Sequence, residues 1–267
     1  MRLKISHQTS YQYQWPASYG LQELRLTPQD SDAQRIVDWQ IALRGGRKEL
    51  QFCDQHQNIV LLIGFLGTGD AISIDCTGEV VTTDTAGIVG RHSGPAPLWY
   101  FETSTPLTRA GNLTRHLAAG LTTKFADPVT RLHALSARVL EAIEWVPGHT
   151  DANTGAEEAL GAGRGVCQDH AHVFIAAARS MGVPARYVSG YLMLTDRIEQ
   201  DASHAWAEAH VDGIGWIGFD VSNGISPDAR YVRVATGLDY RQAAPISGLR
   251  IGNRGDETLA VRIQVQQ

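Results

Sequence analysis

The first 81 residues alternate between apolar and polar positions, whereas apolar residues beyond position 111 recur every three or four places. Alternation from Leu3 to Val81 puts successive side chains on opposite faces, as in strands with one buried face. Turn-rich pieces at 27–30 and 44–46 separate these strands, which is typical of a β-sandwich. We therefore predict a β-sandwich-like amino-terminal domain over residues 1–90.

The segment Gly94-Pro95-Ala96-Pro97 ends the alternating region, and we expect residues 91–110 to form a linker. Helical spacing of apolar residues begins after it, over 112–119 and 128–144. The second domain, residues 111–267, is therefore expected to open with helices.

One more helix and three strands are expected further along the second domain. Apolar residues recur at helical spacing from Cys167 to Met181, and Gly182 with Pro184 supplies a stop signal. Segments of period two then predict consecutive antiparallel strands at 185–192, 203–211 and 215–222. The predicted fold class is α+β, with helices and an antiparallel sheet behind the β-sandwich.

These elements carry the three residue types of a thiol-based acyl-transfer site. Cys167 lies in the first helical turn, where the helix dipole and free backbone N–H groups favour a thiolate and can hold an oxyanion. His204 can take and return a proton, and Asp220 can orient the imidazole. Gly163 and Gly165 would let the backbone approach a substrate. A buried cysteine in a core helix is the competing interpretation.

The turn from Asp212 to Gly215 decides whether Asp220 reaches His204. A four-residue loop would turn the side chain of Asp220 to the opposite face of the sheet. A loop of three or five residues, or one bulge, would place Asp220 opposite Trp206 or Glu208, on the face of the histidine. A catalytic site therefore requires an odd loop or a bulge here.

Charge and hydropathy argue against several classes of partner. The formal net charge is -5 and the chain has no dense run of lysine and arginine, which disfavours nucleic acid or an anionic membrane. The longest apolar run, Ile59 to Leu66, is too short to span a bilayer, and no secretory signal follows Met1. We expect a cytoplasmic protein with no nucleic-acid or membrane partner.

The three cysteines, Cys53, Cys76 and Cys167, include no C-x-x-C pair of the kind that binds zinc or does redox work. Cys53 and Cys76 are expected to be reduced, buried thiols, and a bridge between them stays open if the protein is exported. His170 and His172 superficially suggest a metal, but positions 167 and 172 do not share a helix face. We expect no metal and no cofactor.

Four motifs together resemble a known bacterial family, the transglutaminase-like superfamily with its cysteine proteases. His7 to Tyr13 and Glu23 to Leu26 resemble the family's amino-terminal β domain, so the resemblance covers nearly the whole chain. The four motifs are Gly163-Arg164-Gly165-Val166-Cys167-Gln168-Asp169, Pro184-Ala185-Arg186-Tyr187-Val188-Ser189-Gly190-Tyr191, Ser203-His204-Ala205-Trp206 and Gly215-Trp216-Ile217-Gly218-Phe219-Asp220.

The resemblance implies a papain-like core in which Cys167 is the nucleophile, His204 the base and then the acid, and Asp220 the orienting carboxylate. Three positions depart from the family's pattern. Leu238, in the segment Arg233 to Tyr240 that resembles the family's segment after the aspartate, stands where arginine is more usual. Gln57 stands where the family usually has glycine, and His170 stands where phenylalanine is usual. Such a His170 would touch the pocket wall more than the chemistry.

Further residues are candidate contacts for substrate or an oxyanion, namely Gln168, Asp169, Trp145, Trp206 and Tyr191. Asp169 is at least as well suited to capping the helix start. Trp145 could offer its indole N–H to the acyl site, although core packing is the commoner role of a tryptophan. Trp206 and Tyr191 either wall a substrate groove or fill the sheet.

The sequence thus predicts a thiol hydrolase that cleaves a peptide, amide or isopeptide bond through a cysteinyl thioester. A protein-glutamine transglutaminase would use the same residues with an amine in place of water. A non-catalytic peptide-binding module would keep the fold without the reaction. In each case the partner is a peptide or protein, and no sequence signal indicates an oligomeric state.

Overall fold

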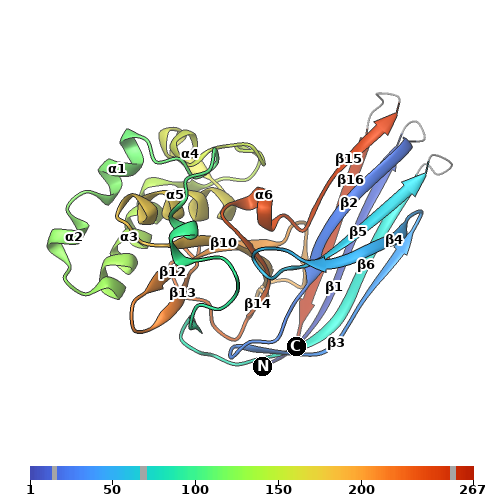
Figure 1. Cartoon of the computed structure of the whole chain (residues 1–267), viewed down its shortest axis with the longest axis horizontal. Coiled ribbons are helices and arrows are strands. Elements are labelled where there is room, and N and C mark those ends of the chain that lie inside the picture. Colours follow the sequence, from blue (N-terminus) through green and yellow to red (C-terminus); the bar gives the residue numbers. More distant parts are fainter. Residues whose placement is uncertain (14–16, 67–70, 253–256) are drawn as a thin grey trace.

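The structure is a computed structural model of the chain, and it describes residues 1–13, 17–66, 71–252 and 257–267. A β unit and a unit of helices on a sheet lie side by side (Figure 1). The domains expected from the sequence also include residues 14–16, 67–70 and 253–256, which lie outside the described residues.

Within the described residues, the β unit consists of a five-stranded and a four-stranded sheet. The larger sheet joins, in order, β11 (Glu199–Gln200), β16 (Glu257–Gln266), β1 (Arg2–Tyr13), β6 (Ala71–Thr82) and β3 (Gln34–Arg44). The smaller sheet joins β15 (Ile246–Gly252), β2 (Ala17–Thr27), β5 (Ile59–Leu66) and β4 (Arg47–Cys53).

The two sheets pack face to face through the apolar positions of the alternating pattern. Leu24 and Ile63 of the smaller sheet share a buried cluster with Ile74 and Cys76 of the larger one. Burying each large aliphatic side chain contributes about 1.5–3 kcal/mol, so this interior holds the sheets together. The prediction of an amino-terminal β-sandwich is confirmed.

The strands β15 and β16 return from the end of the chain to the β unit. β15 pairs with β2, and β16 pairs with β1 from Lys4↔Gln266 to Tyr13↔Glu257. Conversely, β7 (Ile88–Gly90) pairs with β13 (Gly215–Phe219) in the other unit. The structure therefore divides the chain differently from the expected domains, because alternation identifies a strand but not the sheet that receives it.

The second unit is built on a sheet of order β14-β10-β12-β13-β7, with β14 (Tyr231–Gly237), β10 (Ala185–Leu192) and β12 (His204–Val211). Helix α5 (Cys167–Ser180) packs on this sheet, and its residues from Val173 to Ala178 are fully buried. None of the described helices is long and apolar enough to cross a membrane.

The second unit also contains further helices and two short strands. Asp127 caps one of them by accepting a hydrogen bond from the backbone N–H of Thr130 at 2.7 Å, with Pro128 in the first helical position. These elements are η1 (Leu98–Glu102), α1 (Asn112–Ala118), α2 (Leu121–Lys124), α3 (Pro128–Ala142), β8 (Glu144–Trp145), α4 (Ala156–Ala162), β9 (Arg164–Gly165) and α6 (Tyr240–Ala243).

Side-chain amides of the β unit cover the free edge of β14. Asn58 Nδ2 donates to the carbonyl oxygen of Thr236 at 2.7 Å, and the Thr236 N–H donates back to Asn58 Oδ1 at 2.8 Å. Gln34 makes the same pair of bonds with the backbone of Arg233, both 2.8 Å long. Each amide thus takes the place of a strand residue and satisfies groups that an edge strand leaves unpaired.

Glu208 lies completely buried between two arginines. Arg186 Nε donates to Glu208 Oε2 at 2.6 Å, and Arg233 Nε donates to Oε1 at 2.8 Å. Burial acts to raise the pKa of Glu208, but the two guanidinium groups outweigh it and lower the pKa from 4.5 to about 2. A carboxylate whose pKa is lowered in the folded protein stabilises the fold at pH values above its unfolded-state pKa. This contribution is lost as pH falls from 4.5 toward 2.

We predict that Glu208→Gln lowers the free energy of unfolding at pH 7 by about 3–5 kcal/mol, because two buried guanidinium groups lose their shared carboxylate. The variant should also lose part of the acid sensitivity that the wild type shows between pH 4.5 and 2. Urea unfolding at a series of pH values measures both effects. The control is Glu49→Gln, which breaks an exposed 2.7 Å pair with Arg47 and should change little. Equal effects from the two variants would contradict the prediction.

Candidate active site

Helix α5 begins at Cys167 because the residues around it fix the helix start. Asp169 Oδ2 accepts hydrogen bonds from the backbone N–H of Val166 and from Thr150 Oγ1, both at 2.7 Å. A Cβ on Gly165 would lie 2.7 Å from the Cβ of Asp169, so the glycine makes room for this carboxylate. Asp169 therefore braces the helix start, and Gly165 serves Asp169 rather than a substrate.

A short turn brings His204 and Asp220 together. Strands β12 and β13 pair with Val211 opposite Gly215, so residues 212–214 form a three-residue loop. This is one of the odd loops that the sequence required for Asp220 to share the histidine's face. His204 Nε2 and Asp220 Oδ2 are 2.6 Å apart.

Cys167 lies close enough to His204 to act on its imidazole together with Asp220. Burial acts to lower the pKa of His204, but the interactions with Asp220 and Cys167 outweigh burial and raise the pKa to about 10. Burial acts to raise the pKa of Asp220, and its hydrogen bonds, led by that to His204, lower it overall. The arrangement therefore favours an imidazolium held between a carboxylate and a thiol, the state that stabilises a thiolate.

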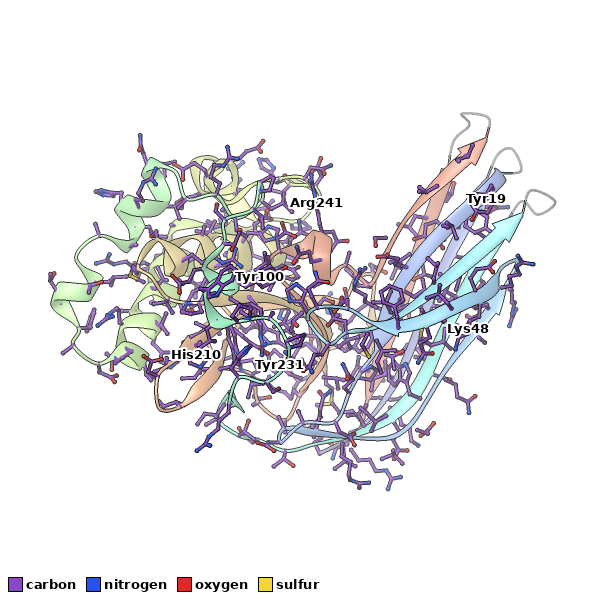
Figure 2. All side chains as sticks on the ribbon, viewed as in Figure 1. Tyr19, Lys48, Tyr100, His210, Tyr231 and Arg241 are labelled. Carbon is purple, nitrogen blue, oxygen red and sulfur yellow. The ribbon has the colours of Figure 1, made fainter. Side chains whose placement is uncertain are left out.

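Two residues that the sequence did not single out also hold Asp220. Tyr231 donates its hydroxyl to Asp220 Oδ2 at 2.6 Å, and Asn223 Nδ2 donates to the same oxygen at 2.7 Å. The ring of Tyr231 lies 6.0 Å from that of His204, and Figure 2 shows this tyrosine near the junction of the two units. Because Tyr231 belongs to β14, two strands away from β12, the sheet order brings it here rather than any local motif.

Several candidate residues are buried. Trp206 and Tyr191 are each 2% exposed. Trp206 stacks on His204 at 6.2 Å, and the hydroxyl of Tyr191 lies 2.8 Å from His7 Nδ1 of the β unit. His170 is also buried, and it bonds Ser222 Oγ and the backbone carbonyl of Ile143. These side chains fill and join the sheet.

Trp145 is 56% exposed, so its expected packing in the core is wrong. It pairs with Gly165 in the short parallel contact between β8 and β9, two residues before Cys167. This pairing keeps the indole at the surface beside the start of α5. The amide of Gln168 turns to the backbone carbonyl of Asp151, at 3.3 Å.

The other cysteines are both free, and they differ in exposure. Cys76 is buried as expected, whereas Cys53 is exposed, because every residue of β4 is exposed. The expectation of a buried thiol at Cys53 is therefore wrong. In the described part of the chain, no group of three His, Cys, Asp or Glu side chains is placed to hold a metal ion.

Comparison with known proteins finds family matches in both units of the structure. Residues 115–221 match the transglutaminase-like superfamily, and residues 3–81 match the bacterial transglutaminase-like N-terminal region. An uncharacterized protein of Mycobacterium leprae is 28% identical over 99% of this chain and 98% of its own. One of Mycobacterium tuberculosis is 29% identical over 99% of this chain and 92% of its own.

A solved structure shares the fold across both units. The protein called "Putative Cysteine Protease" from Cytophaga hutchinsonii covers 100% of this chain and 90% of its own, with a TM-score of 0.79 and 22% identity. The fold is thus of the transglutaminase-like class, with helices and antiparallel sheets behind a β-rich region. The chain belongs to the transglutaminase-like superfamily and carries the bacterial N-terminal region of that family.

We predict that Asp220→Asn reduces the proton affinity of His204 at least about tenfold, because the imidazolium loses its carboxylate partner. The raised pKa keeps the His204 ring protonated as pH rises. Without the carboxylate of Asp220, the ring should lose its proton at lower pH. NMR titration of the histidine side chains measures this directly. The matched control is Asp228→Asn, whose carboxylate pairs with Arg230 at 2.7 Å. An unchanged His204 titration in Asp220→Asn would refute the assignment.

We predict that Tyr231→Phe moves the acid limb of Cys167 alkylation to higher pH, because Asp220 loses one donor and its pKa rises. The rate near neutral pH should fall only about threefold to tenfold, since Asn223 and His204 still bond the carboxylate. Iodoacetamide labelling across pH 4–9 measures the profile. Tyr100→Phe, remote from Asp220, is the control. A Tyr231→Phe profile that keeps the wild-type shape would show that the hydroxyl has no role in tuning the site.

Proposed function

We propose that the protein is a thiol hydrolase that cleaves a peptide, amide or isopeptide bond through a thioester on Cys167. The observation that carries this proposal is the 2.6 Å hydrogen bond between His204 and Asp220, with Cys167 close enough to the same imidazole to act on its pKa. A nucleophile, a base and an orienting group within hydrogen-bond reach are the parts that covalent acyl transfer needs. The shared fold with the protein called "Putative Cysteine Protease" agrees with the same reaction class.

In the acylation step, the thiolate of Cys167 attacks the carbonyl carbon of the substrate and forms a carbon–sulfur bond. The carbonyl π electrons move to the oxygen and give an oxyanion. When the oxyanion collapses, the bond to the amine breaks, and His204 transfers its proton to the leaving nitrogen. Because Asp220 and its donors hold the imidazolium, His204 keeps that proton available near neutral pH.

The oxyanion needs hydrogen-bond donors that point at it before the reaction begins. Cys167 occupies the first position of α5, where backbone N–H groups have no partner within the helix. We assign the Cys167 N–H as one donor and the indole N–H of exposed Trp145 as the second. The helix dipole adds positive potential at the same place.

In the deacylation step, a water molecule attacks the thioester while neutral His204 takes its proton. The carbon–sulfur bond then breaks, the product leaves as a carboxylic acid, and the thiolate–imidazolium pair is restored. A primary amine in place of water would give transamidation by the same residues. Access of water or amine to the thioester decides between the two outcomes.

We predict that the wild type cleaves members of a peptide library and that Cys167→Ala abolishes cleavage, a loss of at least about a thousandfold. Mass spectrometry of the products, with and without a primary amine, measures the reaction. The matched control is Cys53→Ala, which removes an exposed thiol and should leave activity unchanged.

Each product of this assay has a distinct mass. Hydrolysis of an amide supports the proposal, whereas incorporation of the amine identifies a transglutaminase. Absence of both reactions, together with slow alkylation of Cys167, would favour a non-catalytic peptide-binding module.

A further inference from the structure

A polar pocket of about 280 Å³ lies between the two units, apart from the candidate active site. The β unit contributes the turns at 29–32 and 55–58, and the segment from Val89 to Ala96 closes another side. The second unit contributes Arg186, Trp216 and Arg233. Ligand pockets usually measure about 300–1,000 Å³, so this pocket suits a small solute.

The base of the pocket carries an unbalanced positive charge. Arg186 and Arg233 share the single carboxylate of Glu208, which is fully buried. Within the described residues, neither arginine forms an ion pair with any other carboxylate. Two guanidinium groups and one carboxylate leave a charge of about +1 at this end of the pocket, where a single negative charge would be stabilised. Arg91, Asp30 and Asp32 also line the pocket and bring the sum over all six groups to about zero.

Arg186 is held in a position from which it can bind an anion. Its guanidinium carbon lies 3.9 Å from the centre of the Trp216 ring, and its Nε is engaged by Glu208. Its two Nη groups make no hydrogen bond in the described part of the chain. A planar guanidinium fixed on an indole can present such donors to a carboxylate without further loss of side-chain entropy.

The same pocket also offers acceptors for a positively charged group. The exposed carboxylates of Asp30 and Asp32 line it, and within the described residues they form no ion pair with Arg186 or Arg233. His56 lines the pocket too, but its Nδ1 is buried and faces no open space.

We propose that this pocket binds a small α-amino acid, with its carboxylate on Arg186 and Arg233 and its ammonium group on Asp30 and Asp32. The separate clusters of donors and acceptors match the two ends of such a zwitterion. A dianion such as phosphate fits less well, because Asp30 and Asp32 would repel its second charge. The site is independent of the thiol chemistry, since none of Cys167, His204 and Asp220 lines it.

Isothermal titration calorimetry of the full chain with four probes tests the proposal. The probes are alanine, N-acetylalanine, alaninamide and inorganic phosphate, all in a buffer of low ionic strength. Alanine should bind at least about tenfold more tightly than either half-blocked probe, because each blocked end loses one charge-assisted interaction. Two results would contradict recognition of a zwitterion. One is binding of phosphate without binding of alanine, and the other is binding of N-acetylalanine as tightly as alanine. Absence of alanine binding would contradict the site itself.

Arg233→Gln tests the source of the positive charge, because Arg186 and Glu208 then remain as a balanced pair. Alanine affinity should fall at least about tenfold. The matched control is Arg230→Gln, whose arginine pairs with Asp228 at 2.7 Å and does not line the pocket. Unchanged affinity in Arg233→Gln overturns the proposal, and the comparison of probes on the wild type decides the question if this variant fails to fold. Cys167→Ala should bind alanine like the wild type.

Discussion

The docking of two side-chain amides on the free edge of β14 is the interaction on which the rest of the molecule depends. Asn58 and Gln34 bond the backbone at Thr236 and Arg233, in place of another strand. The same strand sends the hydroxyl of Tyr231 to Asp220 and the guanidinium of Arg233 to Glu208. A slip of one residue would turn both side chains to the wrong face, so the β unit fixes the register that the candidate site needs.

At the candidate site, the cost of burying charged side chains is offset by ion pairing and hydrogen bonds. His204 and Asp220 lie where desolvation disfavours ions, and each keeps its charge only because the other, with further donors, is held close. Tyr231 and Asn223 bond the oxygen of Asp220 that also faces His204. The cost of burying the pair is therefore offset by several short bonds rather than by one.

Local chemistry and short-range register could be predicted from the sequence. The order of cysteine, histidine and aspartate identified the candidate triad, and the spacing from His204 to Asp220 required an odd loop that residues 212–214 provide. Helix α5 was expected over 167–181 and runs from Cys167 to Ser180. These features depend on neighbours in the chain, which periodicity and turn chemistry describe well.

Features that depend on distant neighbours could not be predicted. Tyr231 reaches Asp220 only through the order of strands in the sheet, and Trp145 is exposed because β8 pairs with β9. Alternation in 246–252 and 257–266 shows nothing about which sheet will accept these strands. Cys53 is exposed together with every other residue of β4, and the alternation of that strand places it on the face of Gln51, opposite Phe52.

The return of β15 and β16 makes the second unit an insertion within the β unit. Strand β1 is flanked on one side by β6 and on the other by β16, so the contacts of one strand span almost the whole chain. Closing so long a loop costs entropy before pairing repays it, which slows folding. During synthesis, β1 keeps one side unpaired until residues 257–266 have left the ribosome, and in that interval the nascent chain is exposed to aberrant strand pairing.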